Sequence, residues 1–368
     1  MIATSKGGEE HMRRTLAVAV ALAAGALAVA GQTRAATWTI HADRPGKPPA
    51  GAPTTLLNQF FPRRLEIHAG DEVRFFSKEF HTATFLGKAK PARLPFLFPD
   101  PGNSELTGIT DSTGETFWFD GLVKLIYNAQ LTRPSGSTTV SGTAVHNSGI
   151  LLFHKRGYSF DVPKPGVYRY FCAVHPTMSG TIVARRKSAR IPSKDAVQVK
   201  VAERLRKSWA EAGRLAKQVP PLARTVYAGL GKDVAVLTFQ PKKLTIPVGE
   251  SVTWVNRSPS ERHNMAFGLE KYVLSLRKET DLLPVVPQAP NQVSPFITHG
   301  SEQPGQYVHD GTNHGNGFLA TPAIDDVPGN PPRGLVGRFS IRFTAAGSFK
   351  YLCMIHGKGM RGEIVVTE

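Results

Sequence analysis

Cysteine is scarce in this sequence, since its 368 residues include only two. Two cysteines exclude a disulfide-rich scaffold, a four-cysteine zinc site and an iron–sulfur cluster. Acidic residues are also few, with 28 Asp and Glu against 45 Lys and Arg and a formal net charge of +17. The chain is not disordered by composition, because 41% of its residues are hydrophobic and 20% are charged. A metal site must therefore combine at most one thiolate with other donors, such as the 12 histidines.

Long apolar runs are limited to residues 16–30, which follow Arg13 and Arg14. A run of 15 residues is shorter than the roughly 20 that a membrane-spanning helix needs. Basic residues, a short apolar stretch and nearby Ala-x-Ala-like sites are typical of a secretory signal peptide. We therefore expect residues 1–35 to be a signal peptide, cleaved after Ala30 or Ala35, and the mature protein to be periplasmic or secreted, with no permanent membrane span.

Basic residues are concentrated in residues 185–224, which contain 12 Lys and Arg against 3 Asp and Glu. Apolar residues recur there at three- and four-residue spacing, between Ser193 and Pro220, which predicts one amphipathic helix. Its apolar stripe is expected to pack on a neighbouring domain. The alternative is a docking surface for an acidic partner or an anionic membrane. Nucleic acid is not expected, because the basic residues are not interleaved with aromatic ones.

The sequence on one side of this helix repeats on the other. Residues 61–75 align without gaps on 240–254 at an offset of 179, and residues 165–175 align on 346–356 at an offset of 181. Both copies contain short alternating runs rich in Val, Ile, Phe and Tyr, separated by Gly and Pro turns, which is typical of an all-β sandwich. Helical periodicity is otherwise confined to a possible segment at residues 117–131.

The copies define the predicted domain organisation. The expected parts are a first β-sandwich at residues 36–186, a basic helical linker at 187–224 and a second β-sandwich at 225–368. A minimal sandwich needs roughly 100 residues, so the surplus in each copy is expected in loops.

Each copy also carries a matched set of metal-donor residues. A histidine is followed by a cysteine, by a second histidine three residues later, and by a methionine. The first set is His81, Cys172, His175 and Met178, and the second is His263, Cys353, His356 and Met360. One thiolate, two imidazoles and a thioether form the donor set of a mononuclear copper site that transfers electrons. Each sulfur is expected to point into its sandwich at the end of a strand, before a tight ligand loop.

The cysteines and histidines of this chain have other interpretations. A lone Cys or His is usually part of a packed core, but four matching donor types occur twice in register. A disulfide between Cys172 and Cys353 is disfavoured, because equivalent positions deep in two sandwiches should lie too far apart. His299, His309 and His314 are close in sequence and could hold another metal.

These residues resemble the cupredoxins, the blue copper proteins that include plastocyanin, amicyanin and pseudoazurin. Residues 172–180 are similar to the short ligand loop of amicyanin, and residues 353–362 form a loop one residue longer. The resemblance implies two tandem Greek-key β-sandwiches, each with one type 1 copper ion. It also implies that Thr82 and Asn264, which follow the first histidines, tie that strand to the cysteine loop by hydrogen bonds.

The resemblance implies an electron carrier with redox partner proteins, and the net positive charge favours partners that are acidic at the contact surface. Two-domain copper oxidases and nitrite reductases share the fold, but they need a His beside the Cys and further His ligands. Cys172 and Cys353 have no adjacent His, and no His-x-His pair occurs, so we do not expect an enzyme. Copper storage, delivery or sensing is the remaining alternative. The unequal ligand loops predict unequal reduction potentials, and transfer between the coppers would be slow if the linker helix held the domains apart.

Overall fold

The computed structural model describes residues 35–88, 95–175, 177–279, 293–325 and 337–368. The predicted signal peptide lies almost entirely outside these residues. Ala36–Glu368 forms one compact unit. Among the described residues, no helix is both long and apolar enough to cross a membrane.

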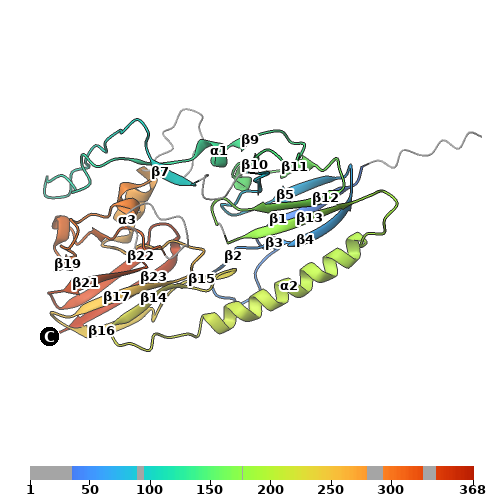
Figure 1. The fold of residues 1–368 in the computed structure, drawn as a ribbon. Helices are drawn as coiled ribbons and strands as arrows, with labels where there is room; N and C mark the ends of the chain where they lie inside the picture. The colour runs from blue at the N-terminus through green and yellow to red at the C-terminus, as the bar shows by residue number, and fades with distance from the viewer. Residues whose placement is uncertain (1–34, 89–94, 176, 280–292, 326–336) are drawn as a thin grey trace, which may run out of the picture. The chain divides into compact units, whose positions relative to one another are not determined.

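The first copy folds into two facing sheets with a shared core, as the alternating apolar pattern predicts (Figure 1). One sheet has the order β11-β5-β1-β3 and the other has the order β4-β13-β12-β6-β10-β9. The strands are β1 (Thr37–Ala42), β3 (Phe60–Phe61), β4 (Arg64–His68), β5 (Glu72–Phe76), β6 (Thr84–Phe85), β9 (Pro134–Ser135), β10 (His146–Ser148), β11 (Tyr158–Asp161), β12 (Gly166–Phe171) and β13 (Ser179–Arg185).

The second copy repeats this topology. Its sheets have the orders β19-β21-β17-β14-β15-β2 and β16-β23-β22-β18-β20, which match the first copy strand for strand in their central parts. The strands are β14 (Thr225–Leu230), β15 (Val234–Gln240), β16 (Lys243–Pro247), β17 (Ser251–Arg257), β18 (Ala266–Phe267), β19 (Val308–His309), β20 (Leu319–Ala320), β21 (Arg338–Phe343), β22 (Gly347–Cys353) and β23 (Gly357–Thr367). The all-β fold with two sandwiches is therefore confirmed.

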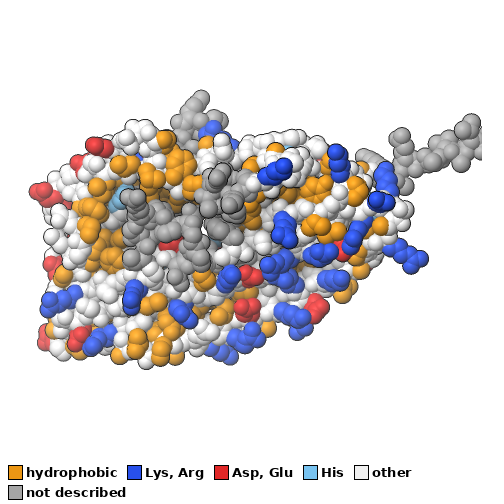
Figure 2. All heavy atoms as spheres, viewed as in Figure 1, with side chains coloured by type: hydrophobic (Ala, Val, Ile, Leu, Met, Phe, Trp, Pro, Cys, Tyr) orange, Lys and Arg blue, Asp and Glu red, His pale blue; other side chains and the backbone are white. Residues whose placement is uncertain are grey.

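The predicted linker helix is α2 (Lys194–Leu215), and its side chains explain its bounds. Ser193 caps the first turn by accepting a hydrogen bond from the backbone N–H of Ala196, and the helix ends before Pro220. Its apolar stripe, including Val201 and Ala212, packs in one cluster with residues of both copies. Lys and Arg side chains gather on the side of the molecule where α2 lies (Figure 2). The packing interpretation of the stripe is thus confirmed.

The remaining elements are short. They are β2 (Thr55–Leu57), β7 (Leu97–Pro99), β8 (Leu125–Tyr127), α1 (Ala129–Thr132), η2 (Leu151–Phe153), α3 (Glu270–Glu279), α4 (Pro295–Thr298) and η3 (Asn313–Gly315). The helix expected at residues 117–131 is wrong for most of its length, because residues 125–127 pair as β8 with β7. Only the last residues of that segment are helical, in α1.

Two segments of the first copy pack against the second copy. β2 belongs to the first copy by sequence, yet it pairs with β15 and extends a sheet of the second copy. Phe117 and Phe119, from a long loop of the first copy, pack with Phe296 and Phe318 of the second. The surplus loop residues therefore build contacts between the copies, and the domain boundaries at 186 and 225 remain a prediction.

Candidate metal centres

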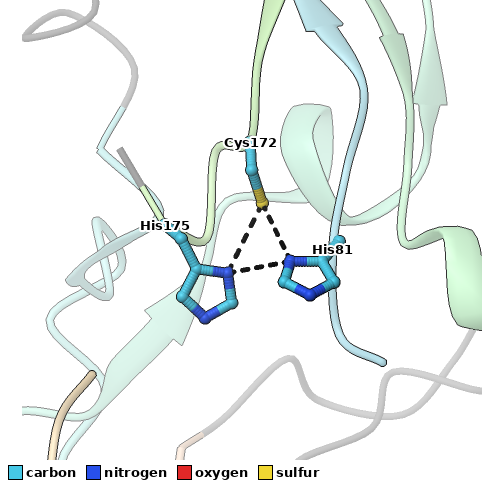
Figure 3. A group of neighbouring side chains, drawn as sticks. All are labelled: His81, Cys172 and His175. Carbon is cyan, nitrogen blue, oxygen red and sulfur yellow. Dashed lines mark hydrogen bonds between the residues drawn. The ribbon is translucent and has the colours of Figure 1, made fainter. Parts of the chain in front are cut away.

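The first donor group is a buried triangle of His81, Cys172 and His175 (Figure 3). The sulfur of Cys172 lies 3.7 Å from Nδ1 of His81 and 3.6 Å from Nδ1 of His175. The two Nδ1 atoms lie 3.0 Å apart. Both imidazoles thus turn the same nitrogen toward one thiol, as metal ligands do.

The second group joins His263, Cys353 and His356, whose donor atoms all lie within 4.8 Å of one another. The sulfur of Cys353 lies 3.4 Å from Nδ1 of His356. The absence of a side chain at Gly229 makes room for the imidazole of His263, because a Cβ at residue 229 would overlap Nε2 of that ring. This glycine, with φ of 68°, was not singled out by the sequence pattern.

Strand ends position these donors. Cys172 directly follows β12 and Cys353 ends β22, so each sulfur is buried between its sheets. His81 precedes β6 and His263 precedes β18, which pair with β12 and β22 respectively. Residues about 90 apart in sequence therefore meet at the same end of each sandwich.

Each predicted methionine ligand is buried in the same core as the cysteine of its copy. Met178 and Cys172 are both buried in the core of the first copy, and Met360 and Cys353 are both buried in the core of the second. The backbone N–H of Cys172 donates to the carbonyl of Met178, which folds that ligand loop back on itself. Both thioethers are thus in the same core as their thiols, as the copper interpretation requires.

Thr82 and Asn264 connect the histidine strand to the cysteine loop in each copy. Oγ1 of Thr82 accepts a hydrogen bond of 2.8 Å from the backbone N–H of Ala173, and its own N–H points at the sulfur of Cys172 at 3.4 Å. Oδ1 of Asn264 accepts a bond of 2.8 Å from the backbone N–H of Met354. Such contacts fix the orientation of ligands around a metal.

The donor groups are electrostatically coupled. Burial alone would raise the pKa of Cys172, but His175 and His81 lower it well below the usual range of a thiol. Burial would lower the pKa of His175, but Glu261 and Cys172 raise it to about 10. In the second group burial would likewise raise the pKa of Cys353, but His356 and His263 lower it. Positive charge on the histidines thus favours each buried thiolate, and a bound copper ion would supply positive charge in the same place.

One residue that the sequence pattern did not reveal lies between the groups. Glu261 is buried, and its two carboxylate oxygens each lie 3.3 Å from Nε2 of a different histidine, His175 and His356. A cavity of 450 Å³ is lined by both of these histidines and by His81. The two groups therefore face a common space.

The other histidines have structural partners. His314 lies between the carboxylates of Asp111 at 3.0 Å and Glu302 at 2.7 Å, which the sequence spacing did not suggest. His309 stacks on Phe343. Among the described residues, groups of three donors occur only at the two sites above. Both cysteines are free, so the disulfide alternative does not apply.

Comparison with known proteins finds similarity to blue copper proteins. No family model matches the chain. The plastocyanin of Scenedesmus fuscus is 28% identical over 138 residues, which are 37% of this chain and 94% of that protein. An amicyanin variant in its Cu(I) form is 20% identical, with 42% of this chain and 89% of that chain covered and a TM-score of 0.21. Amicyanin from Paracoccus versutus is 21% identical, with 41% and 88% covered and a TM-score of 0.22.

Three observations bear on the family. The two sandwiches share one strand order, each buries a His–Cys–His group at the end of its strands, and the plastocyanin similarity spans nearly the whole of that relative. Together they support the cupredoxin family for this chain.

Proposed function

We propose that this protein is an exported electron carrier that holds one type 1 copper ion in each sandwich. The proposed ligands are His81, Cys172, His175 and Met178 in the first, and His263, Cys353, His356 and Met360 in the second. The observation that carries the proposal is the convergence of two Nδ1 atoms on one buried sulfur, with separations of 3.0 to 3.7 Å. Copper bound there would supply a one-electron couple.

Rigid support favours electron transfer over copper delivery. The ligands come from separate strands of a packed sandwich, and Thr82 and Asn264 hold the cysteine loops by buried hydrogen bonds. Such a frame keeps nearly the same geometry for Cu(I) and Cu(II) and retains the ion. Delivery sites instead tend to offer open, incomplete ligand sets.

A copper oxidase or nitrite reductase is the enzymatic alternative. The residues beside Cys172 are Phe171 and Ala173, and those beside Cys353 are Leu352 and Met354. None of these side chains can carry an electron onward to a catalytic copper as an adjacent His would. We therefore favour a carrier whose partners are redox proteins, and its positive charge favours partners that are acidic at the contact.

The test is the visible absorption spectrum of the mature protein after copper addition and oxidation, with copper counted per chain. We expect an intense thiolate-to-copper band that ascorbate bleaches, and two copper ions per chain. A colourless protein that binds less than one copper would contradict the proposal. Ready transfer of the ions to a copper-accepting chaperone would favour the delivery alternative.

A further inference from the structure

Glu261 contacts one histidine of each donor group. Its Oε1 lies 3.3 Å from Nε2 of His175, and its Oε2 lies 3.3 Å from Nε2 of His356. All three side chains are at most 8% exposed. One buried carboxylate thus joins the two groups, with a separate oxygen for each.

Other residues hold this carboxylate in place. Nδ2 of Asn58, in the connection between β2 and β3 of the first copy, donates to Oε1 of Glu261 at 2.5 Å. The same nitrogen also lies 3.1 Å from Oγ of Ser260, which donates to the carbonyl of Lys232. A buried carboxylate needs such donors to offset its loss of hydration. Glu261 is therefore fixed from both copies.

The carboxylate of Glu261 also selects the tautomer of each imidazole that it contacts. An imidazole nitrogen that faces a carboxylate carries the proton, so the other nitrogen is free to bind a metal. In both rings the free nitrogen is Nδ1, which faces Cys172 at 3.6 Å and Cys353 at 3.4 Å. Glu261 thus orients one ligand of each group at the same time.

We propose that Glu261 is a shared positioning residue that couples the two copper centres, so that an electron passes between them within one chain. The path runs from His175 through Glu261 to His356. In each transfer the Cu(I) of one centre is oxidised to Cu(II), the Cu(II) of the other is reduced to Cu(I), and no proton or covalent bond changes. The inference rests on the proposed function, since it requires copper in both groups.

The repeat supplies a matched control. Glu79 precedes His81 by two residues, as Glu261 precedes His263, and both glutamates line the same cavity. Glu79 instead lies 3.7 Å from Arg44, and its side chain is 33% exposed. Glu79→Asp therefore shortens a carboxylate at the equivalent position without touching the connection between the groups.

The first test measures electron transfer within the full-length, copper-loaded protein. A light pulse reduces the sample partially, and the absorbance then reports the redistribution of electrons between the centres. We expect a phase whose rate does not depend on protein concentration. Glu261→Asp keeps the charge but is too short to reach both rings, so the phase should slow about 10- to 100-fold, whereas Glu79→Asp should leave it unchanged. Equal rates in the wild type and Glu261→Asp would overturn the inference.

A second readout does not depend on electron transfer. In the protein loaded with Ag(I), a redox-silent substitute for Cu(I), nitrogen–proton NMR should show two imidazole Nε2–H protons protected from exchange, assigned to His175 and His356. Glu261→Asp should remove the protection of at least one. Absence of both protected protons in the wild type would overturn the inference even if the variant failed to bind copper.

The two proposals fail in different ways. A chain that binds no copper overturns both. A chain with two reducible centres and a redistribution rate that is independent of Glu261 overturns only the inference and leaves the electron carrier intact.

Discussion

At the scale of single residues, the two donor groups repeat one pattern of residue types. Cys172 and Cys353 are the two cysteines of the chain, and each lies three residues before a histidine. The contact of Glu261 with both donor groups could not be predicted, because Glu79 occupies the matching position in the first copy and the sequence does not distinguish the two glutamates. Only the fold decides which of the two faces both donor groups.

Gly229 gives the sharpest test at this scale. We expect Gly229→Ala to lose the copper of the second centre, because the new Cβ overlaps Nε2 of His263, while the first centre keeps its copper. The backbone at this position also has a positive φ of 68°, which costs a residue with a side chain about 1 to 2 kcal/mol. The measurement is copper per chain, with the absorption of each centre.

Gly249→Ala separates the overlap from the backbone strain. Gly249 has a φ of 85°, and a Cβ there would meet no atom within 4 Å. This variant should lose stability to a similar extent but keep both copper ions. Equal copper content in the two variants would show that the overlap with His263 is unimportant.

At the scale of elements, periodicity predicted β-strands and the helix α2 well, because both bury a regular apolar face. It failed for residues 117–131. Phe117 and Phe119 in this segment are buried against the second copy and do not form one face of a helix. Tertiary packing decided the structure of that loop. The pairing of β2 with β15 of the second copy could not be predicted either, because the sequence of a three-residue strand does not indicate its partner.

The ion pairs of His314 with Asp111 and Glu302 predict a pH-dependent contribution to stability. Burial would lower the pKa of His314, but Glu302 and Asp111 raise it above 6.5. Burial would raise the pKa of Asp111, but hydrogen bonds from Thr113 and His314 lower it to about 2. The contribution of His314 is therefore complete below pH 6.5 and lost as the pH rises through its raised pKa, while that of Asp111 is present above pH 3.8 and lost toward pH 2.

His314→Asn tests this contribution, because Asn tolerates the positive φ of 50° at this position. We expect the variant to be less stable than the wild type by about 1 to 2 kcal/mol between pH 3.8 and 6.5, and the difference to shrink at higher pH. Urea unfolding of the metal-free protein at several pH values measures it. A difference that grew with pH would contradict the assigned ion pairs.

At the scale of the whole molecule, the two sandwiches share one topology, but the loops between their cysteine and methionine differ in length. The ligand loop of the second copy is one residue longer, and its β22–β23 pairing shifts register at Cys353. The length of the axial thioether contact tunes the reduction potential of such centres. Voltammetry should therefore show two separate one-electron waves, and coincident waves would contradict the predicted difference.

The duplicated chain also brings its centres together. The sequence left open whether α2 holds the copies apart, and it instead packs on both while β2 and the loop around Phe117 cross between them. His175 of the first group and His356 of the second therefore both contact Glu261. Under the proposed function, one chain would store one electron at each donor group.

The most direct test of two copper centres is a reductive titration of the fully oxidised, copper-loaded protein, with the electrons counted per chain. We predict two electrons for the wild type and one each for Cys172→Ser and Cys353→Ser, with the thiolate-to-copper absorption of the remaining centre retained. One electron in the wild type, or no loss in either variant, would contradict the assignment of one redox-active copper to each sandwich.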